Sequence, residues 1–555
     1  MAESQTGGAS MGAGMPIVDQ GPKQLATGRR AMVSTSHPAV TQAALAVLRD
    51  GGNAVDAMLT AIPLQHVVEP QMSTLAGGFG MLYWEASTGK TTYLNADLDH
   101  PAGAPIPRRG TPEPSGQRIA VPGTVVGMQA AAERFGTRPW ASYFAPAIAA
   151  AEDGYPMYSF LYGELAGAWA RVTHYPSGRE RYAPEGYLPP VGSTYRQPAH
   201  AAALRRIARD DGVAWFQLGE FAQHFVDAVV ATGGTMTIED MTSYAVRWDE
   251  PLRFRAFGHD LVGAPIPDYG PFFVDFTLGV LERAGVSPDE PWLRSPRAML
   301  LIARALAAAE DHVARYARDP AAFDLPVETL LSPEYLELQA RLLSGSFPKV
   351  DLTPAKPDLS AAPSAGGSET GKTDSNHLVI VDEAGNWLSM LHTVYGTPFG
   401  TGLVVDGISV NSGNGFPGVA VGPGRRIVTP LTPVLAMRDG RPWLGIGTPG
   451  SACQTIALVL LNLLGYGMGL EEAIDAPRFR LETIDMAEYS WTSGRLTTET
   501  RIPAETVRGI TALGVEVAPL GDYNWHLGSV QAVMRDGERL IGATDPRRCG
   551  HAAGY

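Results

Sequence analysis

The chain has 555 residues and a formal net charge of −14. A charged fraction of 18% beside 45% hydrophobic residues is typical of a globular protein and excludes disorder over the whole chain. Nucleic acid and anionic membranes are bound by basic surfaces, so the acidic balance argues against both and favours a small-molecule or peptide-like substrate.

The length exceeds that of a usual single domain, and we expect either two domains or two interlocked halves. Residues 1–27 are rich in Gly, Ser, Ala and Gln and are predicted to form a flexible segment. They lack the basic region followed by an apolar stretch that marks a secretory signal. No stretch reaches the roughly 18 uninterrupted apolar residues of a membrane span. The predicted location is therefore cytoplasmic.

The first predicted elements are two helices and a strand. Apolar residues recur at helical spacing over 38–50 and again over 54–64. A glycine-rich turn at 77–80 then leads into a strand at 81–84. The middle third, including 201–209 and 298–318, is predicted to be mainly helical.

Strands return in the last third, at 378–381, 387–391, 403–405 and 434–437, followed by a helix over about 453–464. Turn sequences at 383–386 and 438–440 follow the strands, as antiparallel hairpins require. Residues 351–374 form a tract rich in Pro, Ser and Gly, which predicts a linker. Together these elements indicate helices on both faces of stacked antiparallel sheets.

Ser375 is the candidate nucleophile, because it follows this linker and enters a buried strand. No Gly-x-Ser-x-Gly elbow surrounds it, so a different base is needed. Cleavage between Asp374 and Ser375 would free an α-amine of pKa about 7.7–8.0 beside the hydroxyl. A single cleavage would then create both nucleophile and base. The alternative is that Ser375 only caps the loop before the strand.

The chain resembles the γ-glutamyltransferase family of N-terminal-nucleophile hydrolases along nearly its whole length. The resemblance is carried by GGNAVDA at 51–57, VPGT at 121–124, WASYFAPAIAAA at 140–151, APRF at 476–479, DPR at 545–547 and the final Gly-Tyr. It implies an α+β fold with four layers, an αββα sandwich. It also implies a large-subunit region at 28–350, the linker at 351–374 and a small-subunit region at 375–555.

The resemblance also implies the catalytic residues. The family nucleophile lies two residues before a histidine that opens a strand, which corresponds to Ser375 ahead of His377. Thr393 falls where the family has a second threonine near the nucleophile, although it could equally be an ordinary strand residue. Gly450 and Ser451 match the glycine pair whose N–H groups form the oxyanion hole. The family more often uses threonine as nucleophile, so Ser375 is a departure.

The implied substrate pocket departs further. Where the family places an arginine for the donor's α-carboxylate, this chain has Asp97, which would repel that group. The acidic motif that binds the α-amine is replaced by a segment containing Asn411 and Asn414. Thr429 and Pro430 replace a serine pair, and Tyr395 replaces an asparagine. The interval from Phe416 to Arg426 is short for a lid, which predicts an open site.

The sequence thus predicts a self-processed amidohydrolase that forms an acyl-enzyme on Ser375 with a small substrate that is not γ-glutamyl. One alternative is a true γ-glutamyltransferase or glutathione hydrolase, and another is a non-processing binding or scaffold protein. No metal or other cofactor is predicted. The two fragments are expected to stay together as a heterodimer, with acyl transfer and higher assembly left open.

Overall fold

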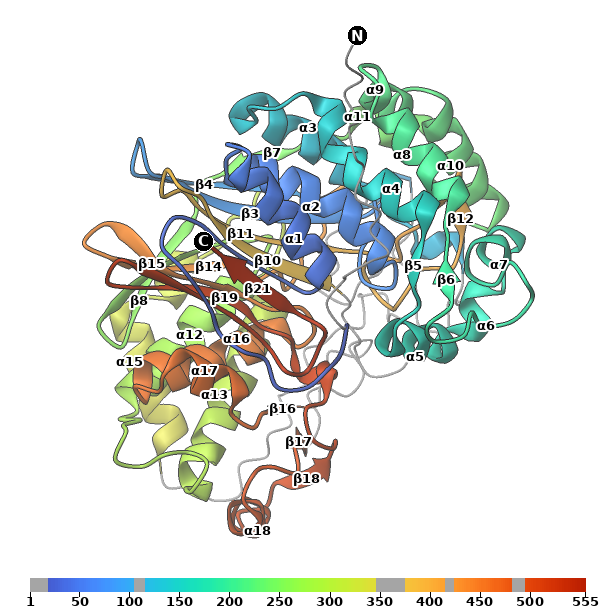
Figure 1. Cartoon of the computed structure of the whole chain (residues 1–555). Coiled ribbons are helices and arrows are strands. Elements are labelled where there is room, and N and C mark those ends of the chain that lie inside the picture. Colours follow the sequence, from blue (N-terminus) through green and yellow to red (C-terminus); the bar gives the residue numbers. More distant parts are fainter. Residues whose placement is uncertain (1–17, 104–114, 346–374, 415–423, 482–494) are drawn as a thin grey trace.

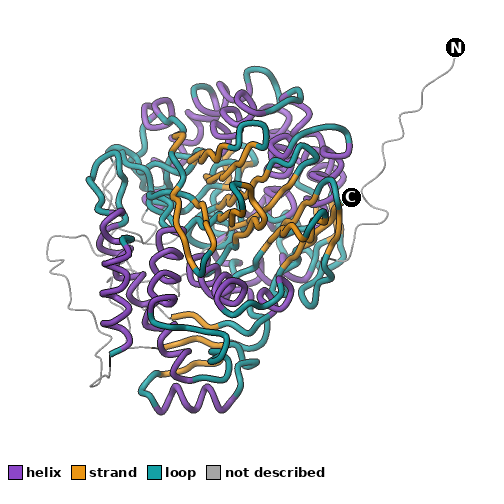
Figure 2. Tube along the Cα trace, turned by 90° about the vertical axis from the view of Figure 1, so that its left-hand side faces the viewer, coloured by secondary structure: helices purple, strands orange, loops and turns teal. Residues whose placement is uncertain are grey.

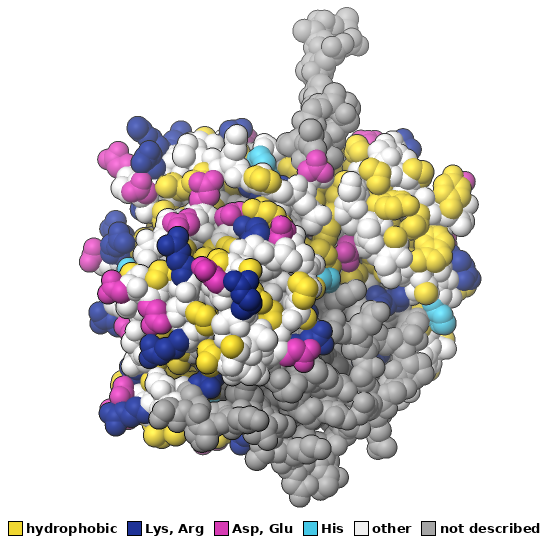
Figure 3. Space-filling model, turned by 90° about the horizontal axis from the view of Figure 1, so that it is seen from below, with side chains coloured by type: hydrophobic (Ala, Val, Ile, Leu, Met, Phe, Trp, Pro, Cys, Tyr) yellow, Lys and Arg dark blue, Asp and Glu magenta, His cyan; other side chains and the backbone are white. Residues whose placement is uncertain are grey.

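The computed structural model describes residues 18–103, 115–345, 375–414, 424–481 and 495–555. Most of the predicted N-terminal segment, the linker at 351–374, Asp374 and most of the expected lid interval lie outside these residues. On the face seen in Figure 3, cationic and anionic side chains are interspersed and do not gather into a basic patch.

Two seven-stranded antiparallel sheets form the centre of the molecule. We call them the nucleophile sheet and the second sheet. The nucleophile sheet runs in the order β21 (His551–Gly554), β2 (Met32–Thr35), β10 (Ser375–Val381), β11 (Trp387–Thr393), β3 (Gly78–Glu85), β4 (Lys90–Ala96) and β7 (Arg247–Asp249). The second sheet runs in the order β1 (Ala26–Gly28), β20 (Arg539–Thr544), β19 (Gln531–Asp536), β15 (Arg441–Gly447), β14 (Val434–Arg438), β9 (His259–Gly263) and β8 (Leu252–Ala256).

Helices cover the outer face of each sheet, so the layers alternate as helix, sheet, sheet and helix (Figures 1 and 2). The nucleophile sheet is covered by α1 (Pro38–Arg49), α2 (Ala54–Val68), α3 (Thr124–Phe135) and α4 (Ala145–Asp153). The second sheet is covered by α12 (Gly270–Arg283), α13 (Pro296–Tyr316), α15 (Pro333–Ser344), α16 (Ala452–Leu460) and α17 (Leu470–Asp475).

Smaller elements complete the fold. The further helices are α5 (Ser159–Gly167), α6 (Trp169–Val172), α7 (Pro176–Tyr182), α8 (Pro198–Ile207), α9 (Gly212–Gln217), α10 (Glu220–Ala231), α11 (Ile238–Ser243), α14 (Val327–Leu330) and α18 (Ala504–Ala512). The minor sheets pair β5 (Tyr155–Pro156) with β6 (Thr194–Tyr195), β12 (Val404–Val405) with β13 (Ile408–Ser409), and β16 (Phe479–Leu481) with β17 (Arg495–Thr498) and β18 (Glu516–Pro519).

Strand β10 explains the continuous apolar run after Ser375. Successive side chains of a strand point to opposite faces. Leu378 and Ile380 join the core beneath the helices of the nucleophile sheet, and Val379 and Val381 join the core between the two sheets. Because both faces of the strand are buried, the sequence shows no polar alternation.

Local capping fixes the ends of α2, the innermost helix of its layer. The Asn53 side chain accepts from the N–H groups of Val55 and Asp56, and the Asp56 carboxylate accepts from the Asn53 N–H, each at 2.9 Å. Such a reciprocal capping box satisfies donors that the first helical turn leaves unpaired. All fifteen residues of α2 are buried. The helix therefore gives rigid support to the loop that begins at Glu69.

The predicted four-layer fold is confirmed, with differences in detail. The second predicted helix extends to Val68, and strands β7, β8 and β9 lie within the middle third that was predicted to be mainly helical. Both sheets combine strands from before and after Ser375, so the predicted halves are interlocked. Among the described residues, no helix is both long and apolar enough to cross a membrane.

Candidate active site

Ser375 lies at the first position of β10, in the middle of the nucleophile sheet, and its side chain is 7% exposed. The antiparallel register places it directly opposite Thr393, the last residue of β11. The Thr393 hydroxyl accepts a hydrogen bond from the Tyr395 N–H at 2.9 Å. The two predicted hydroxyl residues therefore lie side by side at the same end of two central strands.

The backbone carbonyl of Ser375 is held from two sides. The buried guanidinium of Arg548 donates to it at 2.9 Å. The side-chain amide of Asn376 has two acceptors on one side, the Ser375 carbonyl and the Glu69 carboxylate. The Ser73 hydroxyl lies on its other side. The amide NH2 group faces the two acceptors at 3.3 and 3.1 Å, and the amide oxygen accepts from Ser73 at 3.1 Å. The Ser375 carbonyl is thus held by Arg548 and by the neighbouring Asn376, whose amide is oriented by Glu69 and Ser73.

His377 has a structural role. Its Nε2 lies 2.9 Å from the Ser389 hydroxyl of the neighbouring strand. The ring packs so closely against Gly447 that a Cβ there would lie 2.4 Å from Nε2. Burial lowers the pKa of His377 to about 3, so the ring is neutral at ordinary pH. These contacts make His377 a support for the strand.

The Gly450 turn follows β15, a strand of the second sheet. This strand packs against β10 and β11 of the nucleophile sheet. Gly450 has φ +82°, a conformation that favours glycine. A Cβ at Gly450 would lie 3.2 Å from the Cα of Gly528. Ser451 is the N-cap residue of α16, so N–H groups and the positive end of the helix dipole lie at this turn. Such donors are suited to an oxyanion.

A chain of contacts joins this turn to the nucleophile. Gly450 lies next to Gly528 and the carbonyl of Trp525. The Trp525 ring lies 4.8 Å from the guanidinium carbon of Arg548, and Arg548 bonds to Ser375. The sequence singled out both Gly450 and Ser375, and Trp525 and Arg548 connect them in the structure.

Asp97 is completely buried, and its carboxyl group is occupied by protein partners. One oxygen accepts from the Leu98 N–H at 2.8 Å and from the Tyr395 hydroxyl, and the other accepts from the Thr429 hydroxyl at 3.1 Å. Tyr395 has φ +60°, which is strained for a non-glycine residue. Asp97, Tyr395 and Thr429 are therefore in direct contact, and their role in substrate binding stays a prediction.

A second buried carboxyl group, Asp268, completes this cluster and was missed by sequence reasoning. It accepts from the Tyr93 hydroxyl at 2.5 Å, from the Asn95 amide at 2.8 Å and from the Thr429 hydroxyl. Burial, reinforced by the charge of Asp268, raises the pKa of Asp97 well above its usual range. Burial also raises the pKa of Asp268, to about 6, against the opposing effect of its hydrogen bonds. The two carboxyl groups therefore retain a shared proton at pH values where isolated aspartates are ionised.

The nearest buried cation, Arg426, is fully engaged. Its Nε donates to Asp99 at 2.7 Å, its Nη1 donates to the side chain of Asn95 at 2.7 Å, and its Nη2 donates to the Ala245 carbonyl at 2.6 Å. The guanidinium carbon also lies 4.9 Å from the Tyr244 ring. The guanidinium is thus part of the buried framework and presents no fork to a ligand.

Asn411 and Asn414 also bond to the protein itself. The Asn411 amide donates to the carbonyls of Ala76 and Ala120 and accepts from the N–H groups of Ala120 and Gly413, at 2.8–3.0 Å. Asn414 donates to the Gln117 carbonyl at 2.7 Å, and its oxygen lies 2.6 Å from Nδ1 of His100. As substrate-binding residues both stay predictions, and these bonds make them determinants of pocket shape.

An apolar cluster lies in the same region. Leu98, Ala120, Tyr395 and Ile427 form a core separate from the three larger ones, and each is at most 2% exposed. The residues come from segments far apart in the sequence, and Leu98 directly follows Asp97. The buried carboxyl groups of Asp97 and Asp268 are thus accompanied by a small apolar core at Leu98 and Tyr395.

Behind the nucleophile lies a buried polar chain that sequence reasoning did not identify. Nε2 of His66 lies 3.0 Å from Nδ1 of His392, and Nε2 of His392 lies 3.0 Å from the Gln65 oxygen. The Gln65 amide donates to Glu69 at 2.8 Å. Burial raises the pKa of Glu69 to about 7 and lowers that of His392 to about 3. The chain ends at the carboxylate that contacts Asn376.

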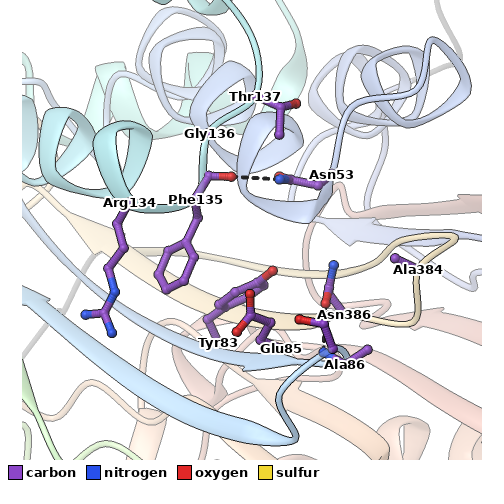
Figure 4. Close-up of a pocket in the computed structure, with 11 residues that line it drawn as sticks. Asn53, Tyr83, Glu85, Ala86, Arg134, Phe135, Gly136, Thr137, Ala384 and Asn386 are labelled. Atoms are coloured by element: carbon purple, nitrogen blue, oxygen red, sulfur yellow. Dashed lines mark hydrogen bonds between the residues drawn. The ribbon is translucent and has the colours of Figure 1, made fainter.

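A cavity of about 580 Å³ lies at the far end of the nucleophile sheet from Ser375 (Figure 4). It is lined by the end of β3 at Glu85, the start of α2 at Asn53, the end of α3 at Arg134 and Phe135, and the β10–β11 turn at Asn386. The seven residues of β10 separate it from Ser375 by roughly 20 Å. It is therefore distinct from the predicted catalytic centre.

No group of three or more His, Cys, Asp or Glu within the described ranges is placed to hold a metal ion. The two cysteines, Cys453 and Cys549, are both buried and not joined by a disulfide. Burial raises the pKa of each thiol, to about 12 for Cys549 and further for Cys453. Both are therefore poor nucleophiles.

Two stacked antiparallel sheets between helical layers, with a hydroxyl residue at the start of a central strand, define the fold class of the N-terminal-nucleophile hydrolases. A family model described as gamma-glutamyltranspeptidase matches residues 40–555, and the chain belongs to this family. Members of the family are hydrolases and acylases that act on amide bonds.

The proteins similar to this chain include both glutathione hydrolases and acylases. A glutathione hydrolase proenzyme of Bacillus subtilis is 28% identical, covering 96% of this chain and 92% of that protein. The acylase ACY 1 proenzyme of Pseudomonas sp. strain V22 is 29% identical, with 89% and 88% covered. The crystal structure of a cephalosporin acylase from Bacillus halodurans superposes with a TM-score of 0.81 at 25% identity, with 96% and 97% covered.

Proposed function

We propose that the chain cleaves itself between Asp374 and Ser375 and then hydrolyses an amide bond of a small substrate whose acyl group is not γ-glutamyl. In the first reaction the Ser375 hydroxyl attacks the Asp374 carbonyl carbon, the peptide C–N bond breaks, and water hydrolyses the resulting ester. The products are an Asp374 carboxylate and a free α-amine on Ser375. Proenzyme relatives support this step.

In the second reaction the α-amine accepts the hydroxyl proton as Ser375 attacks the substrate carbonyl carbon. The oxyanion accepts hydrogen bonds from N–H groups at Gly450 and Ser451, each worth roughly 2.7–4 kcal/mol in comparable sites. The C–N bond then breaks, the leaving amine takes the proton, and the acyl group stays on the serine oxygen. Water attacks this ester, giving the free acid and restoring Ser375.

The observation that carries the choice of acyl group is the environment of Asp97. A γ-glutamyl group carries an α-carboxylate, and the position that binds it in the family holds a buried carboxyl paired with Asp268. Arg426, the cation that could replace the missing arginine, is held by Asp99, Asn95 and Ala245. An acyl group without a carboxylate avoids the repulsion and does not require Arg426 to leave its partners.

Glutathione hydrolases and acylases are about equally similar to this chain. The relatives therefore do not choose between γ-glutamyl hydrolysis and the hydrolysis of another amide. A γ-glutamyl activity would require recognition residues outside this cluster. A scaffold function would require that no self-cleavage occurs. These alternatives differ in measurable ways.

Intact mass and N-terminal sequencing of the purified protein test the first step, with Ser375→Ala as control. A fragment that begins at Ser375 in the wild type and an uncleaved variant are expected. If the wild type also remains a single chain, the self-processing proposal fails and the scaffold alternative gains support.

Four p-nitroanilides of equal chain length test the acyl group: γ-glutamyl, glutaryl, 4-aminobutyryl and butyryl. The set crosses the presence of a carboxylate with the presence of an ammonium group. We expect the two acyl groups without a carboxylate to have the higher kcat/KM, by more than about tenfold, because one buried charge conflict exceeds about 1.4 kcal/mol. A preference for γ-glutamyl over the other three would refute the proposed specificity.

A further inference from the structure

The Ser375 carbonyl is bonded to a buried cation. Arg548 lies in the connection between β20 and β21, is 0% exposed, and donates from Nη1 to this oxygen at 2.9 Å. Its guanidinium carbon lies 4.8 Å from the centre of the Trp525 ring and 5.7 Å from that of Phe160. Aromatic rings and burial fix the charge in place and keep water from screening it.

The position of this cation matters because the α-nitrogen of Ser375 belongs to the same residue as the bonded carbonyl. Covalent geometry keeps the nitrogen within about 4 Å of that oxygen, so Nη1 of Arg548, 2.9 Å from the oxygen, lies within about 7 Å of the α-amine. A positive charge at this distance disfavours a second positive charge. It favours the neutral amine, which is the form that accepts a proton.

We propose that Arg548 is a positioning residue for catalysis, which orients Ser375 through its carbonyl and holds the α-amine of Ser375 in its neutral, proton-accepting form near neutral pH. This inference rests on the proposed function, because the α-amine exists only after cleavage before Ser375. It adds a residue from the C-terminal segment to the part of the site that supplies the base.

The carboxylate of Glu69 opposes the effect of the Arg548 charge on the α-amine. Its carboxylate reaches the Ser375 carbonyl through the Asn376 amide, with contacts of 3.1 and 3.3 Å. Burial raises the pKa of Glu69 to about 7, and the charge of Arg548 opposes that rise. Near neutral pH the carboxylate is thus only partly ionised and cancels the cation incompletely. Other buried titratable groups linked to Glu69 are neutral at this pH, among them His392, His66, Tyr158 and Cys549. Lys23 and Asp19 lie beyond Cys549 and interact with its thiol.

Cyanate carbamylation measures the amine directly, because only a neutral amine reacts. The cleaved protein is treated over pH 6–9, and mass spectrometry follows the N-terminal peptide that begins at Ser375. The rate divided by the isocyanic acid concentration at each pH follows the neutral amine, so its midpoint is the pKa of the α-amine, and no substrate is needed. We expect a wild-type midpoint below the ordinary value of about 7.7–8.0.

Three variants separate charge from shape. Arg548→Met should raise the midpoint by about one pKa unit, a tenfold loss of neutral amine on the acidic side. Arg548→Lys keeps the charge and should stay within about 0.3 unit of the wild type. Glu69→Gln removes the opposing charge and should lower the midpoint, by about 0.5 unit.

Opposite shifts for Arg548→Met and Glu69→Gln would establish the inference, since a structural disturbance has no reason to move the midpoint in two directions. An unchanged midpoint in Arg548→Met overturns it. If Arg548→Met is not cleaved, Glu69→Gln decides alone, and an unchanged or raised midpoint overturns the inference. Failure of the wild type to cleave would instead refute the proposed function, so the two failures are distinct.

Discussion

Replacing Asn411 by alanine tests whether its amide is committed to the fold. The side chain makes four hydrogen bonds to the main chain, two from its NH2 group and two to its oxygen, and is 0% exposed. Each such bond contributes roughly 0.5–1.5 kcal/mol, and the variant leaves buried partners unpaired. Asn411→Ala should therefore lower the free energy of unfolding by about 4 kcal/mol.

Asn414→Ala is the matched control, because it removes the same side chain from a nearby buried position with only two hydrogen bonds. Its expected cost is about 2 kcal/mol. The ratio of the two losses, about twofold, is independent of the energy assigned to one bond. Both variants are made in a Ser375→Ala background so that unfolding is that of a single chain.

Urea unfolding followed by tryptophan fluorescence gives the two free energies from the midpoints and slopes. A loss for Asn411→Ala that is no greater than that for Asn414→Ala would refute the reasoning. It would mean that the bonds at Asn411 are replaced by water without cost, and that the amide is available to a substrate.

Two further predictions concern the oxyanion turn and a buried acid. Gly450→Ala should lower kcat by about 10²–10³-fold, because it displaces the N–H donors. The control is Gly440→Ala, which should leave kcat unchanged, since Gly440 has a similar φ of +75° and open space around it. Equal effects of the two variants on initial rates would contradict the assignment. Burial raises the pKa of Asp275 on α12 to about 8, so the wild type should lose stability as pH rises from that of the unfolded carboxyl, about 3.9, through about 8. Asp275→Asn should remove up to about 4 kcal/mol of this loss between pH 5 and 8, and parallel stability profiles for the two proteins in urea unfolding would contradict it.

The position of Ser375 beside Thr393 was within reach of sequence reasoning. The predicted strands at 378–381 and 387–391 surround one short turn, and an antiparallel hairpin fixes which residues lie opposite one another. Extending the two strands to their ends brings Ser375 to Thr393, as the register shows. Local turn chemistry and apolar runs carry this information.

Asp268, Glu69 and Arg548 were beyond such reasoning for a physical reason. Asp268 reaches Asp97 from a loop between the second sheet and α12, and Arg548 reaches Ser375 from between two late strands. Neither contact follows from spacing along the chain, because the packing of sheets against each other creates both. The three strands missed in the middle third are edge or near-edge strands with several charged side chains, which weakens the strand pattern.

Asp97, at the position where the family has an arginine, belongs to a cluster of interacting residues. This cluster limits the effect of the single substitution Asp97→Arg. The carboxyl group of Asp97 is surrounded by Tyr395, Thr429 and Asp268, with Leu98 beside it in an apolar core. A guanidinium placed at position 97 would displace the Tyr395 hydroxyl and enter a space sized for a smaller side chain. It would gain Asp268 as a buried partner, and that carboxylate would occupy the fork intended for a substrate. We therefore expect specificity at this proposed site to depend on the set of contacts, so that several residues must change together before a carboxylate can bind.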